Sequence, residues 1–297
     1  MRGQRNVERI DVKLINDDFV VDFPLTEFQK IAIEIIYNMR TVKLSQLKDM
    51  TGYSYQYITS YMLKLHVNRF VERMFPLKTR DQKGTEEAYF MLDQAGAIFI
   101  SGFYELPMKE VIWNRRDNLI KYDKLNHAFE ISAARAAVER SARERGDKII
   151  NCVCDRHLFL KFKYEDNEFS VRPDMYFTYV ENNRHFNYFV EIDLGTMAVT
   201  GNSFKTEAFD NKVAYYDAYK FSGEYRNKFN VFPRVLVITT TTDRAEKLLE
   251  AVRVKQKSGV EFLFTTLDLW ADNTLNKIFI KAKDANGNDN KPMSMFD

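Results

Sequence analysis

Two aromatic-rich segments, residues 169–180 and 185–193, most constrain the fold of this chain. Both have the composition of strands, and the polar stretch ENNRH between them is typical of a turn. The segments therefore predict an antiparallel hairpin on an apolar background. Asp174 follows a proline in the first segment, and the second ends with Glu191 and Asp193. A hairpin of this length would bring these carboxylates together.

The rest of the second half predicts a mixed sheet covered by helices. A helix closed by Gly146 and two strand candidates precede the hairpin, and apolar strand runs alternate with helices after it. This order favours an α/β unit. The further candidates are helices at 126–146, 203–221 and 243–258, and strands at 148–154, 158–164, 234–240 and 260–266.

The first half predicts a helix-turn-helix. The helix LTEFQKIAIEIIYNM begins with Thr26 as N-cap and Gln29 three residues later, which is a capping box. The second helix, KLSQLKDMTG, has Ser45 as a candidate cap and ends at Gly52. Ser54 can cap a third helix, SYQYITSYMLKLHVNR, after the tight turn TGY. Two strand-like runs around a charged loop follow and predict a β-hairpin, or wing.

Charge indicates DNA as a partner of this half. The whole chain carries a net charge of only +2, so a nucleic-acid surface must be local. Residues 40–84 contain nine Lys and Arg against three Asp and Glu, a net +6. A module for protein contacts, or a helix bundle with a solvated charged loop, is the alternative. The predicted DNA contacts are Ser54, Tyr55, Gln56, Tyr57, Thr59, Ser60 and Lys64 on the third helix and Arg73, Lys78, Arg80 and Lys83 in the wing.

The composition also bears on domains and compartment. We expect a DNA-binding domain at 1–105, a helical connector at 106–125, an α/β domain at 126–282 and a flexible tail at 283–297. No stretch of about 18 apolar residues occurs, so we expect no membrane contact. Two cysteines at i and i+2 are poorly placed for a mutual disulfide, which fits a reducing cytoplasm.

The carboxylates predict a divalent metal site. Mg²⁺, or Mn²⁺, prefers oxygen ligands and usually takes one or two carboxylates with water and phosphate. Asp174 and Glu191 are the expected ligands, the carbonyl of Ile192 is a further oxygen, and Glu130 on the preceding helix is a third carboxylate. The alternatives are that the aspartates are ordinary turn residues and that Glu130 forms a salt bridge.

These motifs resemble known families. RPD and EID resemble the acidic strands of the PD-(D/E)XK nuclease superfamily. More specifically, LTEFQKIAIEIIYNMRTVKLSQL, YFMLDQAGAIFI, LNHAFEI, RPDMYF, FVEIDLGT and KVAYYDAY occur in the order found in the replication-relaxation family of plasmid and mobile-element proteins. The resemblance implies a winged helix followed by a restriction-endonuclease-like mixed sheet flanked by helices. It also implies metal-dependent nicking, with Asp174 and Glu191 as ligands and Glu130 as an added helix carboxylate.

One position departs from the nuclease pattern. The lysine expected two residues after the second acid is replaced by Asp193, which adds a carboxylate and cannot supply positive charge. Some members of the superfamily take this lysine from a helix, and Lys205 and Lys212 are candidates on one helix face. We favour Lys212, whose neighbours Tyr215, Tyr216 and Tyr219 would either contact phosphate or bases or simply pack.

Three functions remain open at this point. The first is a site-specific DNA-binding protein with a metal-dependent nicking endonuclease domain, acting in plasmid or mobile-element replication or mobilisation. The second is a non-catalytic DNA-binding initiator or regulator with a degenerate nuclease fold, which Asp193 favours. The third is an adaptor for protein contacts. Association with other replication or mobilisation proteins and a homodimer are left open.

Overall fold

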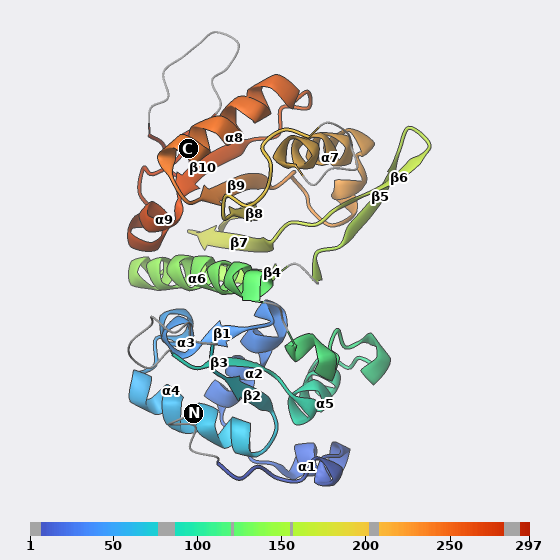
Figure 1. Cartoon of the computed structure of the whole chain (residues 1–297), viewed down its shortest axis with the longest axis vertical. Coiled ribbons are helices and arrows are strands. Elements are labelled where there is room, and N and C mark those ends of the chain that lie inside the picture. The colour runs from blue at the N-terminus through green and yellow to red at the C-terminus, as the bar shows by residue number, and fades with distance from the viewer. Residues whose placement is uncertain (1–6, 77–86, 120–121, 155–156, 202–207, 282–291) are drawn as a thin grey trace. The chain divides into compact units, whose positions relative to one another are not determined.

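The computed structural model describes residues 7–76, 87–119, 122–154, 157–201, 208–281 and 292–297 (Figure 1). They form two compact units, 1–132 and 133–297, so the division falls inside helix α6 (Tyr122–Arg145). The sequence had placed the boundary after residue 125.

The first unit is built from helices and a small sheet. Strands β2 and β3 are the arms of the predicted hairpin, and β3 pairs antiparallel with both β1 and β2. The predicted DNA contacts Lys78, Arg80 and Lys83 lie between these strands at 77–86, outside the described residues. The elements are α1 (Asp17–Asp22), α2 (Glu27–Met39), β1 (Val42–Lys43), α3 (Leu44–Thr51), α4 (Tyr55–Val67), β2 (Val71–Met74), β3 (Tyr89–Leu92) and α5 (Gln94–Phe103).

Local capping explains where these helices begin. The capping box of Thr26 and Gln29 is confirmed, and the Ser54 side chain accepts a hydrogen bond from the Tyr57 amide at the start of α4. The prediction for Ser45 was wrong, because α3 begins one residue earlier. Ser45 instead donates its amide and hydroxyl to the Glu87 carboxylate, at 2.6 and 2.7 Å.

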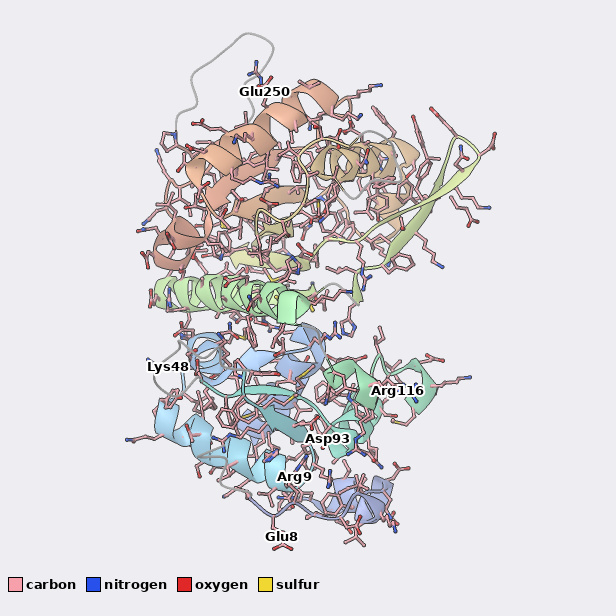
Figure 2. The ribbon with its side chains drawn as sticks, in the orientation of Figure 1. Glu8, Arg9, Lys48, Asp93, Arg116 and Glu250 are labelled. Atoms are coloured by element: carbon pink, nitrogen blue, oxygen red, sulfur yellow. The ribbon has the colours of Figure 1, made fainter. Side chains whose placement is uncertain are left out.

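A buried ion pair ties the N-terminal segment to the first unit (Figure 2). Arg9 donates to the carbonyls of His66 and Val71 and to the carboxylate of Asp93. Asp93 is buried and also accepts the Gln94 amide at 2.8 Å, so one carboxylate caps α5 and neutralises the arginine.

The predicted helical connector contains two 3₁₀ turns, Met108–Glu110 and Arg115–Asn118, rather than one helix. Its side chains bind the first unit, since the Trp113 indole and the Asn118 amide both donate to the Leu92 carbonyl, at 3.1 and 3.0 Å.

The second unit contains a six-stranded mixed sheet, which confirms the predicted α/β fold class. The pairs β4–β7, β7–β8 and β10–β11 are antiparallel, whereas β8–β9 and β9–β10 are parallel. The sheet order is β11-β10-β9-β8-β7-β4. The strands are β4 (Lys148–Cys154), β7 (Met175–Glu181), β8 (Arg184–Asp193), β9 (Arg234–Thr239), β10 (Phe262–Thr266) and β11 (Ile280–Lys281).

The segment predicted as one strand at 169–180 is two. Strand β6 (Asn167–Val171) pairs with β5 (Leu160–Tyr164) in a separate hairpin, and β7 begins only at Met175. Pro173 explains the break, because it has no amide hydrogen to donate to a ladder. Asp174 therefore sits at the point where the chain enters the main sheet.

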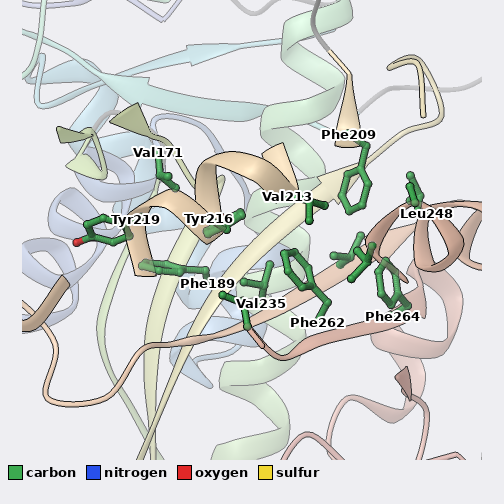
Figure 3. Close-up of a cluster of buried hydrophobic side chains, with 14 of the residues drawn as sticks. Val171, Phe189, Phe209, Val213, Tyr216, Tyr219, Val235, Leu248, Phe262 and Phe264 are labelled. Atoms are coloured by element: carbon green, nitrogen blue, oxygen red, sulfur yellow. The ribbon is translucent and has the colours of Figure 1, made fainter. Parts of the chain in front are cut away.

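Helices cover both faces of this sheet. In Figure 1, α7 (Phe209–Ser222) and α8 (Thr242–Lys255) lie on one side, and the second half of α6 lies with α9 (Leu267–Asn273) on the other. The core under α7 and α8 is aromatic and contains Phe189 and Phe262 (Figure 3).

The last six residues are anchored by Met295 and Phe296, which differs from the flexible tail predicted for 283–297; the part of that tail at 283–291 lies outside the described residues. Met295 is fully buried, and its carbonyl accepts hydrogen bonds from the Tyr188 hydroxyl and from Arg234 at 2.8 and 2.7 Å. The Phe296 ring contacts Tyr179 edge-on. Burial of these apolar side chains outweighs the polar composition of the preceding residues.

We predict that Asp93→Asn destabilises the first unit by ~2 kcal/mol, because it leaves the half-buried Arg9 without its anion. Asp93→Ala should cost about 1 kcal/mol more, since it also removes the cap of α5. Hydrogen exchange of the α5 amides measures both effects. Glu27→Gln, at an exposed pair with 3.9 Å between Glu27 and Lys30, is the control and should change little. Equal protection of α5 in Asp93→Asn and wild type would contradict the role of the ion pair.

Candidate functional site

The ends of β7 and β8 bring Asp174 and Glu191 together. Met175 pairs with Val190, so the next position along the ladder sets Asp174 opposite Glu191. The Asp174 amide donates to the Val190 carbonyl at 3.0 Å, and the Asp174 carboxylate accepts the Ile192 amide at 2.8 Å. Asp174 and Glu191 are 8% and 3% exposed. Two buried carboxylates at neighbouring strand ends require a cation.

Helix α7 supplies that cation. Side chains alternate along a strand, so Asp174 and Glu191 point to the same face as Tyr176 and Phe189, which is the face under α7 and α8. The Lys212 ammonium lies 2.5 Å from Oε2 of Glu191. The buried Tyr216 hydroxyl donates to Oε1 of the same carboxylate at 2.6 Å.

The charges in this cluster are uneven. Burial raises the pKa of Glu191 and so does Asp174, while Lys212 lowers it, and the net direction is upward. Burial alone would lower the pKa of Lys212, but Glu191 and Asp174 outweigh it, so Lys212 stays protonated. The Lys212 ammonium thus interacts electrostatically with both carboxylates.

Asp193 has partners of its own, on β9 and α8. Arg244, near the start of α8, donates to both its carboxylate oxygens, at 2.8 and 3.0 Å, and the Thr239 hydroxyl donates at 2.7 Å. Burial alone would raise the pKa of Asp193, but these hydrogen bonds lower it. Arg244 also donates to the Met197 carbonyl at 2.6 Å. Asp193 is therefore the anchor of a bidentate ion pair that fixes the start of α8 and the chain after β8.

Glu130 stays a prediction. It is half-buried on α6, and burial raises its pKa while Lys43 and His127, both in the first unit, lower it. Over the described residues, no group of three or more His, Cys, Asp or Glu side chains is gathered as a metal site. Lys205 falls outside those residues.

The tyrosines of α7 are mostly packed. Tyr219 is buried in the aromatic core, and Tyr215 is half-buried with its ring 6.2 Å from that of Phe169. Tyr216 is also buried, but its hydroxyl reaches Glu191. The sequence did not reveal this contact or the pairing of Arg244 with Asp193, because no spacing links positions so far apart in the chain.

The residues fit a magnesium ion. Mg²⁺ commonly uses one or two carboxylates and completes its shell with water and substrate phosphate. Asp174 and Glu191 provide two buried carboxylates beside the Lys212 ammonium. No third protein carboxylate is needed for such a site.

The predicted DNA-contacting face of α4 is mostly exposed. Six of its seven predicted residues are exposed, and Tyr57 is half-buried between Tyr53 and Tyr61, with ring centroids at 5.0 and 4.4 Å. Arg73 on β2 lies with its guanidinium 4.9 Å from the centre of the Phe75 ring. The exposed residues are Ser54, Tyr55, Gln56, Thr59, Ser60 and Lys64.

Comparison with known proteins gives one family. The family model described as replication-relaxation matches residues 33–235. No curated protein sequence matches the chain. The restriction endonuclease FokI is 12% identical over 81% of this chain and 42% of its own, with a TM-score of 0.27, and its DNA-bound structure is 11% identical over 83% and 44%, with a TM-score of 0.24. The chain thus spans less than half of FokI, and TM-scores this low do not establish a shared fold. None of the helices in the described ranges is both long and apolar enough to cross a membrane.

We predict that Arg244→Ala destabilises the second unit by ~3 kcal/mol, because it leaves the buried Asp193 carboxylate uncompensated. The double variant Asp193→Ala/Arg244→Ala should cost no more than the worse single variant. Urea unfolding of the four proteins gives the coupling energy.

The exposed pair Arg253–Glu250, on the same helix, is the control for this cycle. Its coupling should stay below about 1 kcal/mol. Additive effects of the Asp193 and Arg244 substitutions would show that the ion pair does not fix this corner of the unit.

Proposed function

Because the chain belongs to the replication-relaxation family, we propose that it binds double-stranded DNA and nicks it with the carboxylates at the ends of β7 and β8. The observation that carries this proposal is the buried cluster of Asp174 and Glu191, in which Lys212 forms an ion pair with Glu191 and also interacts electrostatically with Asp174. Buried carboxylates beside a protonated lysine suit the handling of a phosphodiester. The cellular setting we propose is the replication or mobilisation of a plasmid or similar element.

Asp174 and Glu191 would hold Mg²⁺ or Mn²⁺, with the Ile192 carbonyl as a further oxygen. When bound, the ion supplies polarisation of the phosphate and activation of water. Lys212 would stabilise negative charge on the phosphate, because its ammonium stays protonated beside Glu191. Tyr216 holds Oε1 of Glu191 in place, which fixes the direction of that carboxylate.

The first unit would select the DNA. Two helices joined by a tight turn, followed by an antiparallel strand pair, have the order of a winged helix, in which the second helix reads the major groove. The exposed Gln56 suits a base edge, and Lys64 suits a phosphate. The local net charge of +6 over residues 40–84 supports the same role.

A non-catalytic initiator or regulator is the second candidate function. The observation that favours it is Asp193, which occupies the usual lysine position and is bound by Arg244. Lys212 weighs against it, since an ammonium already lies at the carboxylate pair.

We predict that the protein nicks supercoiled plasmid with Mg²⁺ or Mn²⁺ and that Asp174→Asn and Glu191→Gln abolish nicking. Lys212→Ala should slow it by about 10²–10⁴-fold. Conversion of supercoiled to open-circular plasmid measures the rate, and calorimetric titration with Mn²⁺ measures ion binding independently of activity.

Lys220→Ala, two turns further along α7, is the matched control and should nick at the wild-type rate. A wild-type protein that binds plasmid but never nicks would favour the non-catalytic function. Asp174→Asn nicking as fast as wild type would rule out this site.

We also predict distinct effects on DNA binding. Lys64→Ala should weaken binding to all sequences and reduce the salt slope by about 1, because one phosphate contact is lost. Gln56→Ala should cost about 1–3 kcal/mol only on the preferred sequence. Fluorescence anisotropy at several salt concentrations distinguishes them. Lys109→Ala, an exposed lysine on the segment after α5, is the control. An unchanged salt slope in Lys64→Ala would exclude this face of α4.

A further inference from the structure

Helices α1 and α5 contact each other in the first unit (Figure 1). Side chains of both helices line an open, largely apolar groove. Its volume is about 810 Å³. Three of its lining side chains point outward: Val21 is 82% exposed, Phe103 49% and Met108 44%. Apolar side chains gathered around an open hollow usually mark an interaction site.

The exposure of Val21 is not explained by the packing of α1 within its own unit. Phe19 turns inward, with its ring 5.9 Å from Phe23 and 6.3 Å from Phe70, so the helix already has its buried side. Val21 lies outside that packing. Stability of the single chain therefore gives no reason for a large apolar side chain at position 21.

The charges around the groove narrow the choice of occupant. Asp17, Asp18 and Asp22 are exposed on α1, beside Val21. Acidic residues here disfavour DNA and the anionic surface of a lipid bilayer. A protein surface that is apolar and brings a basic side chain opposite one of these aspartates would fit.

We propose that the occupant is a second copy of this chain, docked through the same groove around a two-fold axis. Such an interface must be self-complementary. If one residue of the first copy contacts a second residue of the other copy, the two-fold axis repeats the same contact with the copies exchanged. The groove offers both halves: Val21 projects from it, and the hollow beside it can receive the Val21 of the other copy.

The groove also carries both signs of charge. Asp17 from α1 and Lys30 from α2 both line it. Asp17 is exposed, and Lys30 forms a long ion pair with Glu27, at 3.9 Å between exposed side chains. In a two-fold pair, Asp17 of each copy would meet Lys30 of the other, twice per dimer. The dimer would present two copies of α4 to DNA, but its formation does not require DNA.

Sedimentation of the full chain without DNA, across micromolar concentrations, tests this inference. Wild type should show a concentration-dependent dimer, and Val21→Glu should raise its dissociation constant by roughly tenfold or more, because a charge then enters an apolar contact. Val254→Glu is the matched control, since Val254 is 78% exposed on α8, and it should dimerise like wild type. Circular dichroism checks that Val21→Glu is folded. A wild type that stays monomeric, or a Val21→Glu protein that dimerises like wild type, overturns the proposal.

A charge exchange tests the pairing itself. Asp17→Lys and Lys30→Glu should each weaken self-association by roughly tenfold, because each places like charges opposite one another twice. An equimolar mixture of the two variants should associate like wild type, since every contact then joins opposite charges. Failure of the mixture to associate overturns the two-fold pairing of Asp17 with Lys30. These results are independent of nicking, so a failed nicking assay leaves them unchanged.

Discussion

The antiparallel register of β7 and β8 is the constraint on which the second unit depends. It sets Asp174 opposite Glu191 and turns both side chains toward α7. A shift of β8 by one residue against β7 would turn the Glu191 side chain to the opposite face of the sheet. The aromatic side chains of β8 would then face away from α7 and α8. Tyr176 and Phe189 oppose such a slip, because their rings lie 5.8 Å apart within the core under α7 and α8.

Once the register buries these carboxylates, the covering helices must provide cations. Lys212 on α7 forms an ion pair with Glu191, and Arg244 on α8 forms one with Asp193. The two pairs differ in balance. Arg244 and Thr239 hydrogen-bond Asp193 and lower its pKa, whereas burial and the nearby Asp174 raise the pKa of Glu191 despite Lys212. The buried carboxylates of Asp174 and Glu191 are therefore where the proposed metal ion would bind.

Local signals in the sequence predicted local structure well. The caps at Thr26 and Ser54 depend on neighbours three residues away, and the structure has both. The register of the hairpin follows from side-chain alternation, which is also local. Contacts between distant segments were not predictable: Ser45 is held by Glu87, and Met295 packs beside Tyr188 far along the chain. In these cases tertiary packing overrides the composition of the segment.

The aspartate at position 193 shows that the position of a residue in the sequence and its location in the fold are different constraints. A residue two positions after Glu191 points to the same face, so a lysine at 193 would lie near the carboxylates. The proposed nicking reaction would need an ammonium close to the carboxylates, whichever position in the sequence provides it. Lys212 on α7 would meet that need, because its ammonium lies 2.5 Å from Glu191. Position 193 is then free to carry an acid, and Asp193 uses it to bind Arg244 and fix α8 against the end of β8. Lys212 therefore places a positive charge beside Glu191, which is where the motif's lysine would lie, and the aspartate at position 193 serves a structural ion pair instead.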